Sequence, residues 1–281
     1  MVIGGLISAT LLTLLVLPTV YTWLEERWDA RQRHHASSAL PKGQSETPVS
    51  LWGGSSANEY PRRQLLCLAE SATPEFSVNR QAHWDGLYTT KHPTELSWYQ
   101  AEPVRSLELL RDAGAGRGTA IIDVGGGDST FVDAVVNEGL GHVTVLDISG
   151  AALARAKARL GPRASDIRWM EADVTRAELT PHSFDVWHDR AAFHFLTGSE
   201  DRGQYVETCA SALRSGGSLV VATFAADGPT HCSGLEVVRY SLDGLLDEFG
   251  DEFALQRGIT DVHFTPRGVE QHFTIALFRR R

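Results

Sequence analysis

Hydrophobic and polar residues alternate in blocks over the middle of the chain. The first short apolar run begins at Ile121, and four further runs cover residues 143–149, 167–170, 184–188 and 218–224. Between these runs lie longer segments that we interpret as helices, at residues 129–138, 150–160 and 205–213. Short apolar runs are typical of buried strands. The alternation of strands and helices predicts an α/β protein with a doubly wound sheet.

Further elements flank this alternating region. Pro103 is well placed to open a helix that continues to about residue 111, because proline is favoured in a first helical turn. After the last apolar run we expect a helix at residues 242–249 and two long strands at residues 254–264 and 271–278.

The most informative stretch follows the first predicted strand. Residues 121–129 read Ile-Ile-Asp-Val-Gly-Gly-Gly-Asp-Ser, so three glycines separate a buried strand from a helix. A turn without Cβ atoms brings main-chain N–H groups close to a ligand. Asp123 lies at the carboxyl end of this strand, where open α/β sheets bind ligands. Taken alone, a glycine cluster also fits an ordinary tight turn.

Acidic residues follow the next strands as well. Asp147 lies 24 positions after Asp123, close to the spacing at which a second-strand carboxylate reaches ribose hydroxyls. Asp173 follows the third predicted strand and Asp189 follows the fourth. Acids at the ends of successive parallel strands gather along one edge of the sheet.

An ordered series of residues resembles class I S-adenosylmethionine-dependent methyltransferases over about residues 80–281, namely Asp123-x-Gly125-x-Gly127, Asp147, Asp173 and Leu213-Arg214-Ser215-Gly216-Gly217. The resemblance implies a Rossmann-like seven-stranded sheet that ends in an antiparallel hairpin, with S-adenosylmethionine as cofactor. A dinucleotide-binding Rossmann domain is the rival interpretation. That rival predicts neither Asp173 nor the Leu-x-x-Gly-Gly turn.

The same resemblance implies how the cofactor is held. The glycines at 125–127 approach its methionine part, and Asp123 holds the amino group. Asp147 takes the ribose hydroxyls, and Asp173 takes the adenine. The cofactor site is therefore predicted to contain Trp98, Tyr99, Asp123, Gly125, Gly126, Gly127, Asp147, Ile148, Asp173 and Val174.

Trp98 and Tyr99 enter this set as parts of a lid. Aromatic residues are dense before the first strand, with His-Trp-Asp-Gly-Leu-Tyr at residues 83–88 and Ser-Trp-Tyr at 97–99. Aromatic residues at this density more often pack than take part in chemistry. In similar methyltransferases, however, the segment folds over the cofactor, and closure excludes water and aligns donor with acceptor.

Candidate catalytic residues follow the fourth predicted strand. His188, Asp189 and His194 are close in sequence, and a histidine there could remove a proton from the acceptor. A ring packed between two phenylalanines is an equally good interpretation of His194. Residues predicted to contact the acceptor lie in later loops and are Cys232, Tyr240 and His263. A lone cysteine is nevertheless more often inert packing.

Composition narrows the partners. The formal net charge of −9 argues against a nucleic-acid-binding face, because phosphate contacts need clustered Lys and Arg. The three cysteines form no Cys-x-x-Cys pair, and the eleven histidines form no His-x-x-x-His spacing on a predicted helix. We therefore assign no metal and no disulfide framework.

The amino-terminal part has a different character. Residues 1–24 carry no charged side chain and are long enough to cross a bilayer. Residues 1–27 resemble the last membrane helix of heavy-metal efflux pumps of the resistance-nodulation-division family. Two interpretations compete, a membrane tether on the cytoplasmic face and a fusion scar from a neighbouring gene. The predicted division is a hydrophobic helix at 1–27, a linker at 28–78 and a methyltransferase domain at 79–281.

The favoured function is a cytoplasmic methyltransferase that uses S-adenosylmethionine on a small-molecule acceptor. A thiol, sulfide or metalloid acceptor fits the efflux resemblance by association. One alternative is a protein lysine methyltransferase, because the Trp84-Asp85-x-x-Tyr88 start and an Asp after the fourth strand also resemble the elongation-factor and citrate-synthase lysine methyltransferases. The alternative from another class is a non-catalytic regulator that binds the cofactor.

Overall fold

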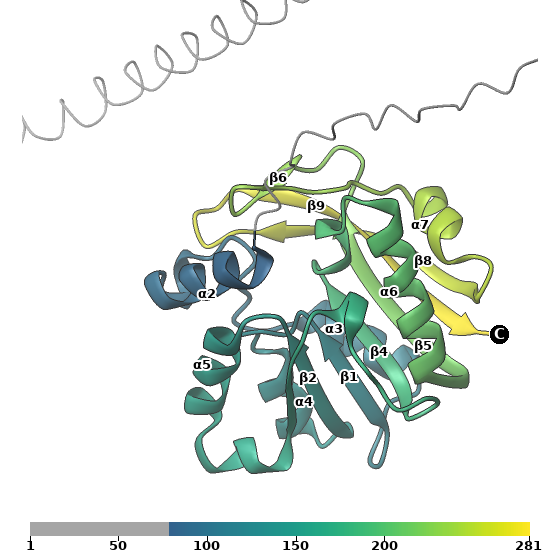
Figure 1. The fold of residues 1–281 in the computed structure, drawn as a ribbon, viewed down its shortest axis with the longest axis horizontal. Coiled ribbons are helices and arrows are strands. Elements are labelled where there is room, and N and C mark those ends of the chain that lie inside the picture. The colour runs from purple at the N-terminus through teal and green to yellow at the C-terminus, as the bar shows by residue number, and fades with distance from the viewer. Residues whose placement is uncertain (1–78) are drawn as a thin grey trace, which may run out of the picture. The chain divides into compact units, whose positions relative to one another are not determined.

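The computed structural model describes residues 79–281, which contain one sheet of seven strands in the order β3-β2-β1-β4-β5-β9-β8 (Figure 1). The strands are β1 Ala120–Val124, β2 His142–Asp147, β3 Arg168–Glu171, β4 Phe184–Arg190, β5 Leu213–Phe224, β8 Phe253–Phe264 and β9 Glu270–Arg280. Strands β1 to β5 pair in parallel, and β9 runs antiparallel to β5 and β8. The predicted doubly wound sheet with its carboxyl-terminal antiparallel hairpin is confirmed.

Six α-helices of the described residues accompany the sheet. They are α2 Arg80–Thr90, α3 Val104–Asp112, α4 Phe131–Glu138, α5 Gly150–Leu160, α6 Ser199–Ala212 and α7 Leu242–Phe249. Short 3-10 turns lie at η1 Pro93–Glu95, η2 Gly161–Asp166, η3 Val174–Arg176 and η4 Phe193–Phe195, and a small hairpin joins β6 His231–Cys232 to β7 Leu235–Glu236.

Two hydrophobic layers cover the two faces of the sheet. Ile121 belongs to the cluster that includes side chains of α3, α4 and α5, whereas its neighbour Ile122 belongs to the cluster of α6 and α7. In Figure 1, α6 lies in front of the sheet and α3 behind it. Successive strand residues point to opposite faces, so a strand between two helix layers is apolar throughout. Residues from Ile121 to Val124 are accordingly all buried.

Most predicted elements agree with the structure, and four differ. Strand β5 begins at Leu213, five residues before the predicted strand, so it includes the predicted Gly216-Gly217 turn. Helix α6 begins at Ser199, six residues before the predicted start, because its first turn is polar and has no apolar pattern. Helix α2 was not predicted as a helix, and it begins where the Asn79 side chain accepts a hydrogen bond from the Ala82 N–H at 3.1 Å. The β6–β7 hairpin lies in a segment that the sequence marks only as a loop.

The predicted hydrophobic helix at 1–27 and linker at 28–78 lie outside the described residues, so they and the domain boundary at residue 79 stay predictions. Among residues 79–281, no helix is both long enough and apolar enough to cross a membrane.

Candidate active site

The glycine turn after β1 has a backbone that other residues adopt only with strain. Gly125 and Gly127 have positive φ angles of 65° and 46°. A Cβ atom on Gly127 would lie 2.9 Å from Oδ2 of Asp147, and one on Gly125 would lie 2.5 Å from Cβ of Ala192. The turn therefore needs glycine both for its conformation and for the close approach of its neighbours.

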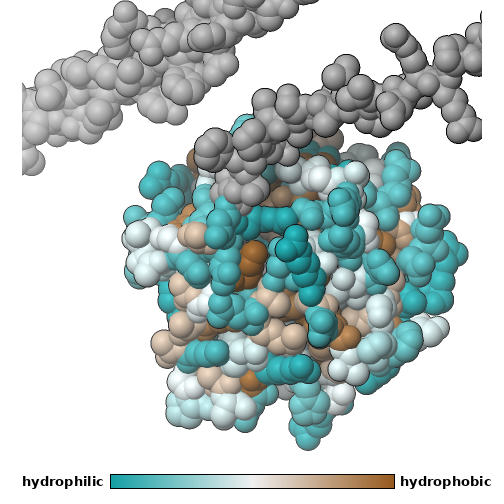
Figure 2. Space-filling model, viewed as in Figure 1, coloured by the Kyte–Doolittle hydropathy of each residue, from teal (hydrophilic) through white to brown (hydrophobic). Residues whose placement is uncertain are grey.

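A pocket opens beside this turn at the carboxyl ends of the parallel strands. It encloses about 900 Å³ of space between atoms, including the part that is open to solvent. Figure 2 shows apolar residues in the middle of this face, surrounded by hydrophilic ones. Of the residues predicted from the sequence, the pocket is lined by Trp98, Gly125, Asp147, Ile148, Asp173, Val174 and Cys232. A pocket lined mainly by apolar side chains with a few convergent polar groups suits a small organic ligand.

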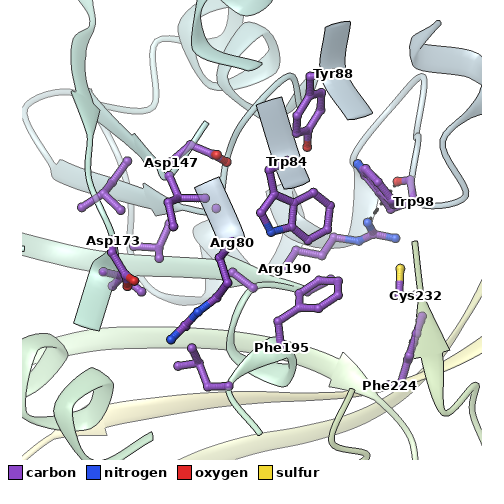
Figure 3. Close-up of a pocket in the computed structure, with 18 of the residues that line it drawn as sticks. Arg80, Trp84, Tyr88, Trp98, Asp147, Asp173, Arg190, Phe195, Phe224 and Cys232 are labelled. Carbon is purple, nitrogen blue, oxygen red and sulfur yellow. Dashed lines mark hydrogen bonds between the residues drawn. The ribbon is translucent and has the colours of Figure 1, made fainter. Parts of the chain in front are cut away.

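Two aspartates lie at one end of the pocket (Figure 3). The buried Asp147 carboxylate accepts a hydrogen bond from the Ser149 N–H at 2.8 Å, and burial raises its pKa to about 7. Asp173 accepts hydrogen bonds from the N–H and the hydroxyl of Thr175 at 3.0 and 2.8 Å, which orients the start of η3. Both carboxylates border the pocket, as a site for ribose hydroxyls and adenine requires.

Asp123 and Gly126 lie beside a second, smaller hollow, whereas Gly127 lines neither hollow. The smaller hollow is lined by Tyr99, Asp123, Gly126 and His188, among others, and shares Gly125 and Trp98 with the larger pocket. Oδ2 of Asp123 is buried without a hydrogen-bond partner in the described chain, and a Cβ atom on Gly126 would clash with it. A carboxylate oxygen with no partner at this turn suits a cationic amino group of a ligand.

Helix α2 covers the pocket and is fastened at several points. Asp85 accepts hydrogen bonds from the Ser149 hydroxyl at 2.7 Å and the Ala151 N–H at 3.2 Å, at the start of α5. Arg155 of α5 donates to the backbone carbonyls of Tyr88 and Lys91, at 2.7 and 2.9 Å. In Figure 3 the rings of Trp84 and Tyr88 extend from this helix toward the pocket that they line.

The lid of the predicted site is therefore larger than its two candidate residues. Trp98 lines the pocket and packs edge to face on Trp84, with ring centroids 5.9 Å apart. Tyr99 lines only the smaller hollow. Trp84 and Tyr88 were predicted only as members of the aromatic segment. Their spacing of four residues on a helix places them on one face.

The structure does not bring the three predicted catalytic residues into the large pocket. His188 is buried, with Nδ1 2.7 Å from Oδ1 of Asp123 and Nε2 2.9 Å from the Ser106 hydroxyl. His194 is fully buried and accepts a hydrogen bond from the Phe224 N–H at 3.2 Å, and burial lowers its pKa to about 3. His188 lines the smaller hollow and His194 lines neither hollow, and a catalytic role for either histidine stays a prediction.

Asp189 points to the opposite face of β4, because it is one residue away from His188. Its carboxylate accepts hydrogen bonds from the N–H groups of Ala192 and Phe193 at 2.8 and 3.0 Å, and from the Tyr205 hydroxyl at 2.6 Å. Burial raises the pKa of Asp189 to about 6. The residue therefore fixes the turn from β4 into η4.

The predicted acceptor residues are distributed over three places. Cys232 lines the pocket, and burial raises the pKa of its thiol. Tyr240 is buried in the core under α7 and donates to Glu248 at 3.3 Å, so it faces away from the pocket. His263 lines neither hollow. Its Nε2 donates to the Ser97 carbonyl at 2.7 Å, which links residues 97–99, the segment that carries Trp98 and Tyr99, to β8.

Several lining residues were not in the predicted set. They include Arg80, Trp84, Tyr88, Arg190, Phe195, Phe224, Gln271 and Phe273. Gln271 and Phe273 are two residues apart on β9, and Phe273 pairs with Phe224 of β5. Period-two spacing in the carboxyl-terminal strand could have indicated that Gln271 and Phe273 share a face, but only the pairing with β5 aims that face at the site.

Comparison with known proteins supports this geometry. Residues 121–217 match a family model described as a methyltransferase domain. The match begins in β1 and ends in the first residues of β5. This part of the chain therefore resembles a methyltransferase domain. Within residues 79–281 no group of three potential metal ligands lies together. The residues at the pocket fit S-adenosylmethionine, the cofactor of methyltransferases of this kind.

The relatives found by sequence similarity are also named as methyltransferases. Uncharacterized methyltransferases of Mycobacterium bovis and Mycobacterium tuberculosis are 33% identical over 118 residues. The match covers 42% of this chain and 57% of each relative, so the chain spans little more than half the length of these relatives.

Solved structures show the same fold at lower identity. One, described by the conversion of a disulfide bond into a thioacetal group during echinomycin biosynthesis, has a TM-score of 0.59 and 20% identity, and the match covers 71% of this chain and 92% of that one. The 1,6-didemethyltoxoflavin N1-methyltransferase of Burkholderia thailandensis has a TM-score of 0.52 and 18% identity, covering 71% and 84%. That enzyme is described with 1,6-didemethyltoxoflavin and S-adenosylhomocysteine bound.

Proposed function

We propose that the protein is an enzyme that transfers a methyl group from S-adenosylmethionine to a small-molecule acceptor. The observation that carries this proposal is the shared pocket, in which Asp147 and Asp173 lie at one end and Trp98, Cys232 and Phe224 at the other (Figure 3). The end with Asp147 and Asp173 is the predicted nucleoside site, and the apolar end with Trp98, Cys232 and Phe224 is called the acceptor chamber below. A single cavity that joins the two suits transfer between two small ligands.

The protein acts mainly by positioning the two ligands and excluding water from them, and less by acid–base chemistry. S-adenosylmethionine supplies a methyl group on a sulfonium whose leaving group is a neutral thioether, so no general acid is needed. Asp147 and Asp173 hold hydroxyl and amino groups of the nucleoside, and the glycine turn lets the backbone approach. Trp84 and Trp98 exclude water from the reacting atoms.

The acceptor end favours a nucleophile that ionises easily. Neither His188 nor His194 lines the pocket, and the thiol of Cys232 has a raised pKa. An acceptor that arrives ionised needs no base from the protein. A thiol or sulfide, whose sulfur loses its proton before attack, therefore stays our preferred acceptor. A metalloid acceptor has less support, because Cys232 lines the pocket as a single thiol.

The rival functions have no comparable support. A cationic lysine side chain would enter a chamber that contains the guanidinium of Arg190, and like charges at short distance are unfavourable. For a non-catalytic regulator, the pocket would need no acceptor chamber beyond the cofactor end, yet the chamber is lined by Phe224, Cys232 and Phe273.

The test is the release of S-adenosylhomocysteine by the full chain with thiol, sulfide, arsenite and lysine-rich protein acceptors. We expect product with a small molecule and none with the lysine-rich protein. The Asp147→Ala variant, which lacks the predicted ribose contact, should lose most of this activity. Tight cofactor binding without product from any acceptor would favour the regulator.

A further inference from the structure

The acceptor chamber contains a guanidinium without a carboxylate partner. Arg190, the last residue of β4, is partly buried and lines the pocket. Within residues 79–281 no carboxylate oxygen lies within 4.0 Å of its side-chain nitrogens, whereas Arg80, at the cofactor end, pairs with Asp201 at 2.6 Å. Asp261, whose charge acts on Arg190, is already paired with Arg105 at 3.3 Å.

The guanidinium is nevertheless held in place. Its Nη1 donates to the Trp98 carbonyl at 3.1 Å, and its Cζ lies 5.0 Å from the centre of the Phe273 ring. Figure 3 shows this side chain reaching toward Trp98 and Cys232, away from Asp173. An arginine has five N–H donors, so most of its donor capacity stays available to a ligand.

A second polar side chain faces the same chamber. Gln271 is 9% exposed, lines the pocket, and its Oε1 has no hydrogen-bond partner in the described chain. An unpaired acceptor oxygen in a pocket wall suits a donor group on the ligand, so Oε1 does not itself favour an anion. The part of this side chain that can bind an anion is its NH₂ group. Its neighbours on the wall, Phe224 and Phe273, are apolar.

From these contacts we propose that the acceptor has an apolar body and an oxyanion group, recognised by Arg190 with help from Gln271. The planar guanidinium matches a carboxylate or phosphate in geometry, and an anion would compensate the buried positive charge. The aromatic rings would enclose the apolar body. This inference rests on the proposed function and narrows its acceptor from a thiol or sulfide to a thiol that also carries an apolar body and an oxyanion group.

The test measures binding to the full chain saturated with S-adenosylhomocysteine, by calorimetry. The probes are phenylacetate, neutral phenylacetamide and cationic phenethylamine, which are similar in size. We expect phenylacetate to bind at least tenfold more tightly than phenylacetamide, and phenethylamine to bind more weakly than both. Equal binding of the three probes, or no binding of phenylacetate, would overturn the inference.

Variants identify the residues responsible. Arg190→Met should weaken phenylacetate at least tenfold and phenylacetamide less than threefold, and Gln271→Leu, of similar volume, should weaken phenylacetate severalfold. Arg257→Met, an exposed position on β8 that does not line the pocket, is the matched control and should leave phenylacetate within threefold.

The affinity of each variant for S-adenosylhomocysteine separates this inference from the proposed function. If the unmodified chain fails to bind S-adenosylhomocysteine, the proposed function fails with it. If Arg190→Met weakens S-adenosylhomocysteine as much as phenylacetate, Arg190 reads the carboxylate of the cofactor and the acceptor inference is wrong.

Discussion

His188 and Asp123 form a buried pair across two neighbouring parallel strands. They are direct partners in the register of β4 with β1, and Nδ1 of His188 lies 2.7 Å from Oδ1 of Asp123. The imidazole also stacks on Phe131 of α4, with ring centroids 3.9 Å apart. The histidine therefore holds the carboxylate that opens the glycine turn.

We expect His188→Phe to destabilise the fold by about 3 kcal/mol, because it leaves a buried carboxylate without its partner. Urea unfolding measures this change. His142→Phe, at the exposed start of β2, is the control and should shift the unfolding free energy by less than about 0.5 kcal/mol. A His188→Phe protein of unchanged stability that has lost only turnover would instead identify His188 as a base.

A methyl group on Gly127 should damage cofactor binding more than stability. In Gly127→Ala the new Cβ meets both the Asp147 carboxylate and the Tyr88 hydroxyl, at 2.9 and 3.0 Å. We expect the affinity for S-adenosylhomocysteine to fall at least tenfold. Gly139→Ala is a matched control, since Gly139 has a φ of 63° but a Cβ added there would meet nothing within 4 Å. It should cost about 1 kcal/mol of stability and leave the affinity unchanged.

The fastening of α2 predicts an effect on the residence time of the cofactor. Asp85→Ala removes the contacts to Ser149 and Ala151, and Arg155→Met removes those to Tyr88 and Lys91. Each variant should increase the dissociation rate of S-adenosylhomocysteine about tenfold in stopped-flow measurements. Asp243→Ala, on the distant α7, should leave the rate unchanged, and equal rates in all three variants would show that α2 is no lid.

The raised pKa of Asp147 predicts a pH dependence of stability without cofactor. Its pKa is about 7 in the fold against an ordinary 3.8, so the folded state binds the proton more tightly than the unfolded state does. The contribution of this group to stability therefore falls as pH rises from about 4 to about 7, by on the order of a few kcal/mol. Asp147→Asn should be more stable than the unmodified protein at pH 8 in urea unfolding, with a difference that shrinks toward pH 4. A difference independent of pH would contradict this account.

The sequence predicts the fold well and identifies the acids and glycines at the strand ends that border the pocket, because those features are local. The second and third apolar runs are each followed by an aspartate, so Asp147 and Asp173 follow from strand ends and from their order along the chain. The glycine turn is likewise contained within residues 125–127, and its conformation needs no partner to be recognised.

The acceptor end depends on contacts between distant segments, which single-sequence patterns do not contain. Whether Asp189 or Arg190 lines the pocket depends on the pleat of β4, and the sequence alone places both simply after a strand. Gln271 reaches the site only because β9 pairs with β5, and the register of His188 with Asp123 places the imidazole beside the smaller hollow and not the larger pocket.

The central claim is that the ends of β1, β2 and β3 hold S-adenosylmethionine. Its most direct test is the affinity of the full chain for S-adenosylhomocysteine by calorimetry, compared with Asp147→Ala and with the control Asp243→Ala. The account predicts binding by the unmodified chain and by the control, and at least tenfold weaker binding by Asp147→Ala with an unchanged circular dichroism spectrum. Equal affinity in Asp147→Ala, or no binding by the unmodified chain, would contradict it.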